Sequence, residues 1–198
     1  MMNKRTLLIS LFLLFTICAA YFVYRYASYE KINIRLQQLH DADQQERYAL
    51  DKDNSEEAWD TITKNDVARR QIVEDMIKNN ELVAPIDFYH AAMIFQHGST
   101  LDDIWQAHTL AKKAAQLGYD KAKWLTAASY DRWLMYQKKP QKYGTQYTDY
   151  GQGVVLYKYD PETTDDERKQ MNVPPLEEAL EMAQRFSKAG ILQPKTTD

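Results

Sequence analysis

The sequence predicts a mainly α-helical protein: an antiparallel helical stack, a small β-hairpin near residues 143–159 and an apolar N-terminal helix. Apolar residues recur at helical spacing over most of residues 30–136, with short breaks between the periodic segments. After Pro140 the pattern changes to short β-rich stretches around a glycine-containing turn. We therefore expect two parts, a membrane anchor or signal segment over residues 1–28 and one mostly helical soluble domain over residues 29–198.

The composition is that of an ordinary globular protein, because 44% of the 198 residues are hydrophobic. A domain of about 170 residues buries roughly 70% of its unfolded surface, so it folds without a disulfide or a metal. The net charge of −3 comes without a basic stripe, which argues against nucleic acid as a partner. Cys18 is the single cysteine. No disulfide within the chain, no metal and no cofactor is therefore predicted.

The segment Thr6–Tyr24 is the feature that predicts a membrane partner. It is uncharged over about 19 residues, close to the ~20 that cross a hydrocarbon core. We expect a single pass through the inner (cell) membrane with the domain outside the cytoplasm, because the preceding tail is very short. The alternative is a signal peptide with Leu7–Ala20 as its apolar core, which would leave a secreted or periplasmic protein after cleavage.

Capping signals divide the rest of the chain into elements. Thr100 with Asp103 forms a capping box, and Gly98 and Gly118 follow helix ends. Pro174-Pro175 is typical of a helix start. The expected helices span residues 30–50, 56–80, 85–97, 100–117, 120–136 and 176–189, with a short one capped by Thr163 or Thr164 and hairpin strands at 143–148 and 154–159.

Alanines recur on the three helices between residues 85 and 136. They occupy positions where helices approach closely (Ala91, Ala92, Ala111, Ala114, Ala115, Ala127 and Ala128). With the short glycine turns, this arrangement resembles a tetratricopeptide-type stack. No second copy follows at a fixed period, so a repeat array is not predicted.

Three groups of polar residues lie in apolar surroundings. Asp131 falls on the apolar stripe of its helix, so it must be paired, with a histidine or with backbone donors of the following loop. His108 lies on the stripe of the preceding helix, where it is either a core histidine or a functional one. Asp43, Gln44 and Arg47 follow His40 at helical spacing. They form either a solvated face or the polar wall of a pocket, and the second reading makes them ligand-binding candidates.

Several short motifs resemble a family of bacterial proteins known only as a domain of unknown function. They are Gln96-His97, the helix end Leu117-Gly118, Asp131-Arg132-Trp133-Leu134, the string QKYGTQ from Gln141 to Gln146, Asp166-Glu167-Arg168 and Val173-Pro174-Pro175-Leu176. The strict motifs cover under half of the chain, and the Q-x-YGTQ box is the most specific. The chain departs from the family in the tight turn at residues 98–100. The resemblance implies a shared site and no particular reaction.

The box offers a set of neutral hydrogen-bonding groups directly after the helix of Asp131. Gly144 lets the backbone turn sharply or lie close to a ligand. Such a set suits a polar, uncharged or zwitterionic group. The predicted ligand-binding residues here are Gln141, Lys142, Tyr143, Gly144, Thr145 and Gln146, together with Arg168.

Two functions are compatible with these residues, so whether the chain is an enzyme is left open. The first is a binding module, in which a helical stack with a polar pocket takes a peptide, a protein or a small polar ligand. The alternative is a hydrolase or group-transfer enzyme with His97 as general acid or base and Asp131 orienting it. Arg132 or Lys142 would then stabilise negative charge, and Tyr143 and Gln146 would position the substrate.

Overall fold

The computed structural model describes residues 4–29, 31–50, 53 and 55–188. These residues form eight helices and one two-stranded antiparallel sheet, as the mainly helical prediction requires. The elements are α1 (Lys4–Tyr29), α2 (Ile34–Ala49), α3 (Glu56–Lys78), α4 (Pro85–Gln96), α5 (Leu101–Gln116), α6 (Ala122–Tyr136), β1 (Tyr147–Asp149), β2 (Val154–Leu156), α7 (Asp165–Gln170) and α8 (Leu176–Lys188).

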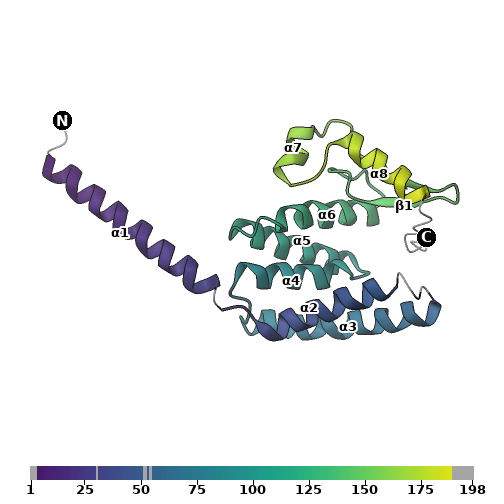
Figure 1. The fold of residues 1–198 in the computed structure, drawn as a ribbon, viewed down its shortest axis with the longest axis horizontal. Coiled ribbons are helices and arrows are strands. Elements are labelled where there is room, and N and C mark those ends of the chain that lie inside the picture. Colours follow the sequence, from purple (N-terminus) through teal and green to yellow (C-terminus); the bar gives the residue numbers. More distant parts are fainter. Residues whose placement is uncertain (1–3, 30, 51–52, 54, 189–198) are drawn as a thin grey trace.

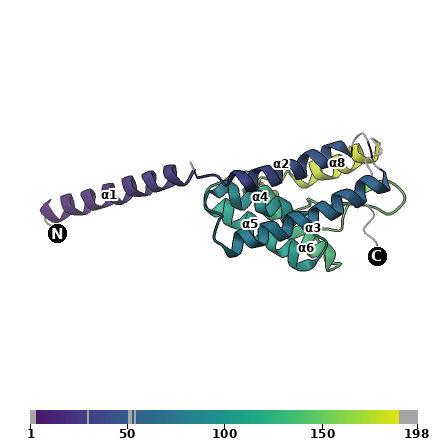
Figure 2. The ribbon, with the colours of Figure 1, turned by 90° about the horizontal axis from the view of Figure 1, so that it is seen from below.

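Helix α1 stands apart from the body of the protein and leads into the start of α2 (Figures 1 and 2). Its apolar side chains are exposed where they are described, among them Phe15, Ile17 and Phe22. Within the part of the chain that the structure describes, no helix combines the length and apolar character needed to cross a membrane. The transmembrane segment therefore stays a prediction.

Helices α2 to α6 form an antiparallel stack in which α4 packs against α2, α3, α5 and α6 (Figure 1). In the core, larger side chains of α2 and α3 pack against the alanines of the later helices. Ala91, Ala107 and Ala111 are fully buried, which allows α4 and α5 to approach closely. Leu36, Val73 and Ile94 fill the space between α2, α3 and α4.

The first stack helix begins later than predicted, at residue 34 in place of 30. Asn33 causes this, because its side chain caps the helix by accepting a hydrogen bond from the Leu36 amide at 3.0 Å. The Asn33 amide in turn donates to Asp87 at 2.9 Å, which ties the start of α2 to α4. The predicted end of the last helix at Ala189 lies outside the described residues.

A hairpin and two helices follow α6 in the chain. Tyr147 pairs with Leu156 and Asp149 with Val154. The strands are shorter than the predicted 143–148 and 154–159, because the amides of residues 142, 143 and 145 bind Asp131 of α6. Beyond the hairpin, Gln141 forms only an isolated bridge with Tyr159. Helix α8 then packs against β2.

Candidate functional site

The loop after α6 wraps around the carboxylate of Asp131, which is completely buried. The backbone amides of Lys142, Tyr143 and Thr145 donate to it at 2.7, 2.9 and 3.1 Å. The hydroxyl of Thr145 adds a fourth donor at 2.8 Å. The prediction that loop backbone donors could pair Asp131 is therefore confirmed. Burial raises the pKa of Asp131, and these donors oppose that rise.

The two glutamines of the box close the same loop from inside. Gln141 is fully buried; its amide group donates to the carbonyls of Gln146 and Tyr157, both at 2.9 Å, and accepts from the Gln146 amide at 2.8 Å. Gln146 donates to the Ala128 carbonyl of α6 at 3.1 Å. Gly144 takes a positive φ of 86° at the turn, a conformation that favours glycine.

Arg168 fixes the loop from the other side. Its guanidinium is almost completely buried and donates to the carbonyls of Tyr143 at 3.0 Å and Thr163 at 2.6 Å. The box, Asp131 and Arg168 form one unit, which we call the Asp131 loop (residues 131, 141–146 and 168). The carboxylate of Asp131 and the amide group of Gln141 are satisfied in it, whereas the buried Nη2 atom of Arg168 has no hydrogen-bond partner among the described residues. Most of its predicted ligand-binding groups are engaged in holding the fold.

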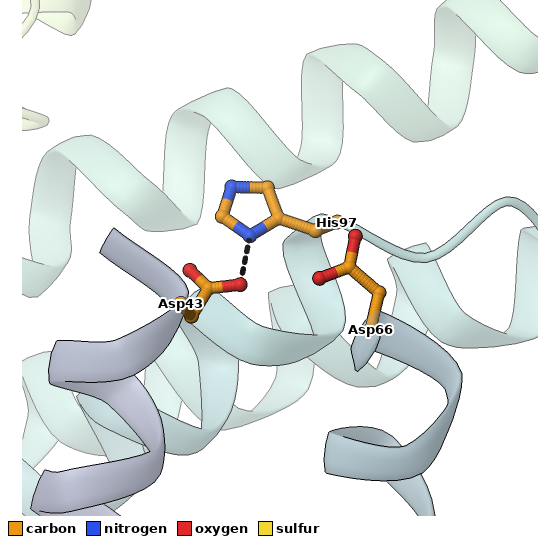
Figure 3. Close-up of side chains that lie close together, drawn as sticks. All are labelled: Asp43, Asp66 and His97. Carbon is orange, nitrogen blue, oxygen red and sulfur yellow. Dashed lines mark hydrogen bonds and ion pairs between the residues drawn. The ribbon is translucent and has the colours of Figure 1, made fainter. Parts of the chain in front are cut away.

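His97 lies in a second cluster, at the junction of α2, α3 and α4. It is the C-terminal capping residue of α4, directly before the turn at Gly98. Its ring faces Asp43 of α2, with Asp66 of α3 on the other side (Figure 3). Its Nδ1 atom lies 3.1 Å from Asp43 Oδ1. Asp43, and not Asp131, is therefore the acid that orients His97, which corrects the predicted pairing; no hydrogen bond or ion pair among the described residues joins His97 to Asp131.

Two arginines neutralise the carboxylates of this cluster. Arg47 Nη2 lies 2.7 Å from Asp66 Oδ2 and 3.4 Å from Asp43 Oδ1. Arg69 Nη2 lies 2.8 Å from Asp66 Oδ1 and 2.7 Å from Glu46 Oε2. Because Asp43 is completely buried, the solvated-face reading of this part of α2 is wrong. We use the name His97 network for six residues, which are Asp43, Glu46, Arg47, Asp66, Arg69 and His97.

The Nδ1 atom of His97 has two neighbours that require opposite roles of it. Arg47 Nε lies 2.9 Å away and can only donate, so it needs a lone pair on Nδ1. Asp43 Oδ1 accepts, so it needs a proton on Nδ1. A neutral imidazole satisfies only one of them at a time, and the other ring nitrogen, Nε2, then becomes a donor or an acceptor accordingly.

The Nε2 atom of His97 is the one ring nitrogen that is free to make a hydrogen bond outside the network. It has no hydrogen-bond partner among the described residues. It is also absent from the set of fully buried, unpaired polar atoms, so it is accessible to solvent. The His97 side chain is 17% exposed. Burial lowers the pKa of His97, assisted by Arg47 and opposed by Asp43 and Asp66, so the neutral ring is favoured. Nε2 is thus positioned to meet a ligand.

The same side chains contain a possible metal-ligand set. Asp43, Asp66 and His97 each offer one ligand atom, and these atoms lie within 4.8 Å of one another. The guanidinium of Arg47 already bridges both carboxylates, however, and supplies positive charge in that space. A cation would have to displace it, so we assign no metal here.

The remaining predicted residues lie in neither network. Arg132 contacts Tyr136, through its hydroxyl at 3.4 Å and over its ring. His108 is half-buried, and its Nδ1 lies 3.0 Å from the carbonyl of Thr126. Gln44 is adjacent to the His97 network, where it donates to Asp43 at 2.7 Å.

Glu46, Asp66 and Arg69 are the members of the network that the sequence analysis missed. Asp66 and Arg69 lie on the buried face of α3 between Ile62 and Val73. The spacing of Ile62, Asp66, Arg69 and Val73 is helical, so an opposite-charge pair at positions i and i+3 of a buried face was the available signal.

No family model matches this chain, and neither a curated protein nor a solved structure does. The resemblance of the Q-x-YGTQ box to a bacterial family therefore stays an expectation. What can be said about function rests on the geometry of the two networks.

Proposed function

We propose that this protein is a membrane-anchored or exported binding module, and that the His97 network is where it takes a small polar ligand. One observation carries the proposal. His97 is held from behind by Asp43 and Arg47, while its Nε2 atom has no partner among the described residues and the side chain is partly exposed. A side chain that recognises a ligand needs a fixed orientation and one free hydrogen-bonding atom, and the His97 ring has both.

A ligand screen with the full chain in detergent micelles tests this proposal. The panel comprises free amino acids, dipeptides, short carboxylates and disaccharides, and the readout is the melting temperature. At least one class should raise the melting temperature of the native chain by mass action and leave His97→Gln unchanged. His108→Gln, a histidine outside the network, should respond like the native chain. A panel that stabilises nothing, or stabilises His97→Gln equally, would refute the proposal.

A second candidate function, general acid–base catalysis, is favoured by the Asp43–His97 pair. A histidine with one nitrogen on a carboxylate and the other free is the minimum arrangement for proton transfer. Model esters, phosphate esters and glycosides with a chromogenic leaving group test it. Turnover that disappears in both His97→Gln and Asp43→Asn would replace the binding proposal by an enzymatic one.

The anchor is proposed from the uncharged stretch Thr6–Tyr24. Alkaline extraction of membranes and N-terminal sequencing of the mature protein distinguish the two versions. Retention in the membrane with an intact N-terminus supports the anchor, and a new N-terminus near residue 21 supports export after cleavage.

A further inference from the structure

Two histidine rings stack on each other where α2 packs against α4. The centroids of the His40 and His90 rings are 4.2 Å apart, and the ring planes differ by 26°. His90 is 5% exposed, and its Nδ1 atom is buried without a hydrogen-bond partner among the described residues. A neutral ring can keep a lone pair at that nitrogen. A protonated ring places an N–H group there with no acceptor, so the packed position favours neutral His90.

The titratable groups around His90 come from α2, from α4 and from the turn after α5. Asp41 lies 3.1 Å from His40 Nδ1 and is 52% exposed, so it pairs with His40 at the surface. The carboxylate of Asp87 already accepts from three backbone amides. None of the described charged side chains of α3, α5 or α6 acts comparably on His90. The groups that face the stack are therefore His40, Asp41, Asp87, Tyr89 and, through Tyr89, Tyr119.

Helix α2 has few buried side chains to hold it in the stack. Of its 16 residues only Leu36 and Asp43 are buried, and Leu39 packs against the core from a partly buried position. The Asn33 amide adds one hydrogen bond to α4 at the start of the helix. The ring stack is therefore one of the few contacts that keep α2 on α4. A helix of this length is marginal in water by itself, so α2 would lose its structure on release.

The same face of α2 completes the His97 network. Asp43 and Arg47 follow His40 by three and seven positions, so the three side chains share one side of the helix. Asp43 and Arg47 are also the two neighbours of His97 Nδ1, at 3.1 and 2.9 Å. A displacement of α2 from α4 therefore removes both groups that orient His97.

We propose that the His40–His90 stack is an acid-sensitive switch, in which protonation of His90 releases α2 from α4 and takes Asp43 and Arg47 away from His97. A charge on both rings would also place two like charges 4.2 Å apart. The switch concerns the position of α2, so it does not depend on which ligand the His97 network takes.

The sign of the effect follows from proton uptake. Burial and the facing His40 hold the pKa of packed His90 at about 4, against the opposing effects of Asp41 and Asp87. Released His90 titrates near the ordinary value of 6.5. The released state therefore binds more protons between these values. Release should become about tenfold more favourable for each pH unit between about 6.5 and 4.

Hydrogen exchange followed by mass spectrometry tests the switch with the full chain in detergent micelles. Labelling at pH 7, 6 and 5 is corrected for the pH dependence of the chemical exchange rate. Protection of the α2 amides should fall by about tenfold per pH unit below about 6.5, while that of α5 stays unchanged. In His90→Phe, which keeps a ring against His40, α2 protection should not depend on pH. His108→Gln, outside the α2–α4 contact, should behave like the native chain.

Three results would overturn the switch. Equal loss of protection in α2 and α5 would mean that acid unfolds the whole stack. Acid release that persists in His90→Phe would exclude His90 as the sensor. Release that disappears in His97→Gln, which should otherwise retain it, would place the sensor in the His97 network.

A measurement on the native chain needs no variant. Nitrogen-15 shifts of labelled histidine should show neutral His90 at pH 5 in the molecules that keep α2 in place. Protonated His90 in a chain with full protection of α2 would refute the switch, because the packed position would then tolerate the charge.

Discussion

The Asp131 loop and the His97 network contain the same kinds of groups, buried carboxylates with basic and amide partners, but they differ in how completely those groups are satisfied. In the Asp131 loop, four donors surround the carboxylate. In the His97 network, one ring nitrogen of His97 has two incompatible neighbours, and the other has no hydrogen-bond partner among the residues that the structure describes. How completely the central group is satisfied, the carboxylate of Asp131 or the imidazole of His97, therefore distinguishes a structural unit from a candidate site better than residue type does.

The largest effect is expected from Asp131→Ala. It leaves three backbone amides and the hydroxyl of Thr145 without an acceptor beside a buried position, so it should lower the free energy of unfolding by about 3–5 kcal/mol. Urea denaturation of the full chain, followed by far-ultraviolet circular dichroism, measures this. Asp60→Ala, which removes an exposed carboxylate of α3, should change stability by less than about 0.5 kcal/mol. Similar values for both variants would mean that the loop does not depend on Asp131.

Acid should act on His90 of α4. Burial and the facing His40 lower the pKa of His90 to about 4, against opposing effects of Asp41 and Asp87. Because the unfolded chain takes up a proton near pH 6.5 and folded His90 does not, stability should fall between about pH 6.5 and 4, by up to about 1.4 kcal/mol per pH unit. Denaturation at several pH values measures the slope.

The variant His90→Phe tests whether His90 causes this dependence of stability on pH. It keeps an aromatic ring against His40, which stacks on His90 at 4.2 Å, and removes the titrating group. The profile should flatten over the same range. An unchanged profile would trace the acid sensitivity to another group.

His97→Gln should cost much less stability than Asp131→Ala. The ring takes part in one hydrogen bond at a time and is partly exposed, so a loss of about 1 kcal/mol is expected. The same denaturation experiment measures it. A loss as large as that of Asp131→Ala would make His97 a structural residue and remove the difference between the two regions.

The smallest change in energy, and the most informative, concerns the proton on His97 Nδ1. Nitrogen-15 chemical shifts of labelled histidine report which ring nitrogen is protonated. Arg47→Met removes the competing donor, so Nδ1 should become protonated towards Asp43; Asp43→Ala should move the proton to Nε2. Identical spectra for both variants would show that the two neighbours do not compete.

Much of the fold follows from local sequence signals. The capping box at Thr100 and Asp103 starts α5 where predicted, and the glycines at 98 and 118 follow helix ends. The strands were predicted too long because Tyr143 and Thr145 favour β-structure locally. Their amides instead bind the buried Asp131, a contact between segments that propensity does not describe.

The site was predicted only in part. The burial of Asp131 followed from its place on an apolar stripe. The partner of His97 did not, because Asp43 lies 54 positions away and sequence spacing within one helix gives no distance between helices. Proximity in the chain favoured Asp131 and its loop, whereas the stack brings α2 and α3 to the end of α4.

Gly98 shows how narrow the tolerance at this junction is. A methyl group at that position would lie 2.7 Å from the carboxyl carbon of Asp103, closer than non-bonded atoms normally come. The turn that carries the chain from α4 into α5 therefore admits only a hydrogen atom there. Any bulkier replacement requires the side chain of Asp103 or the turn itself to shift, and His97, one residue earlier, lies directly before that turn. The small size of Gly98 therefore helps to keep His97 in position.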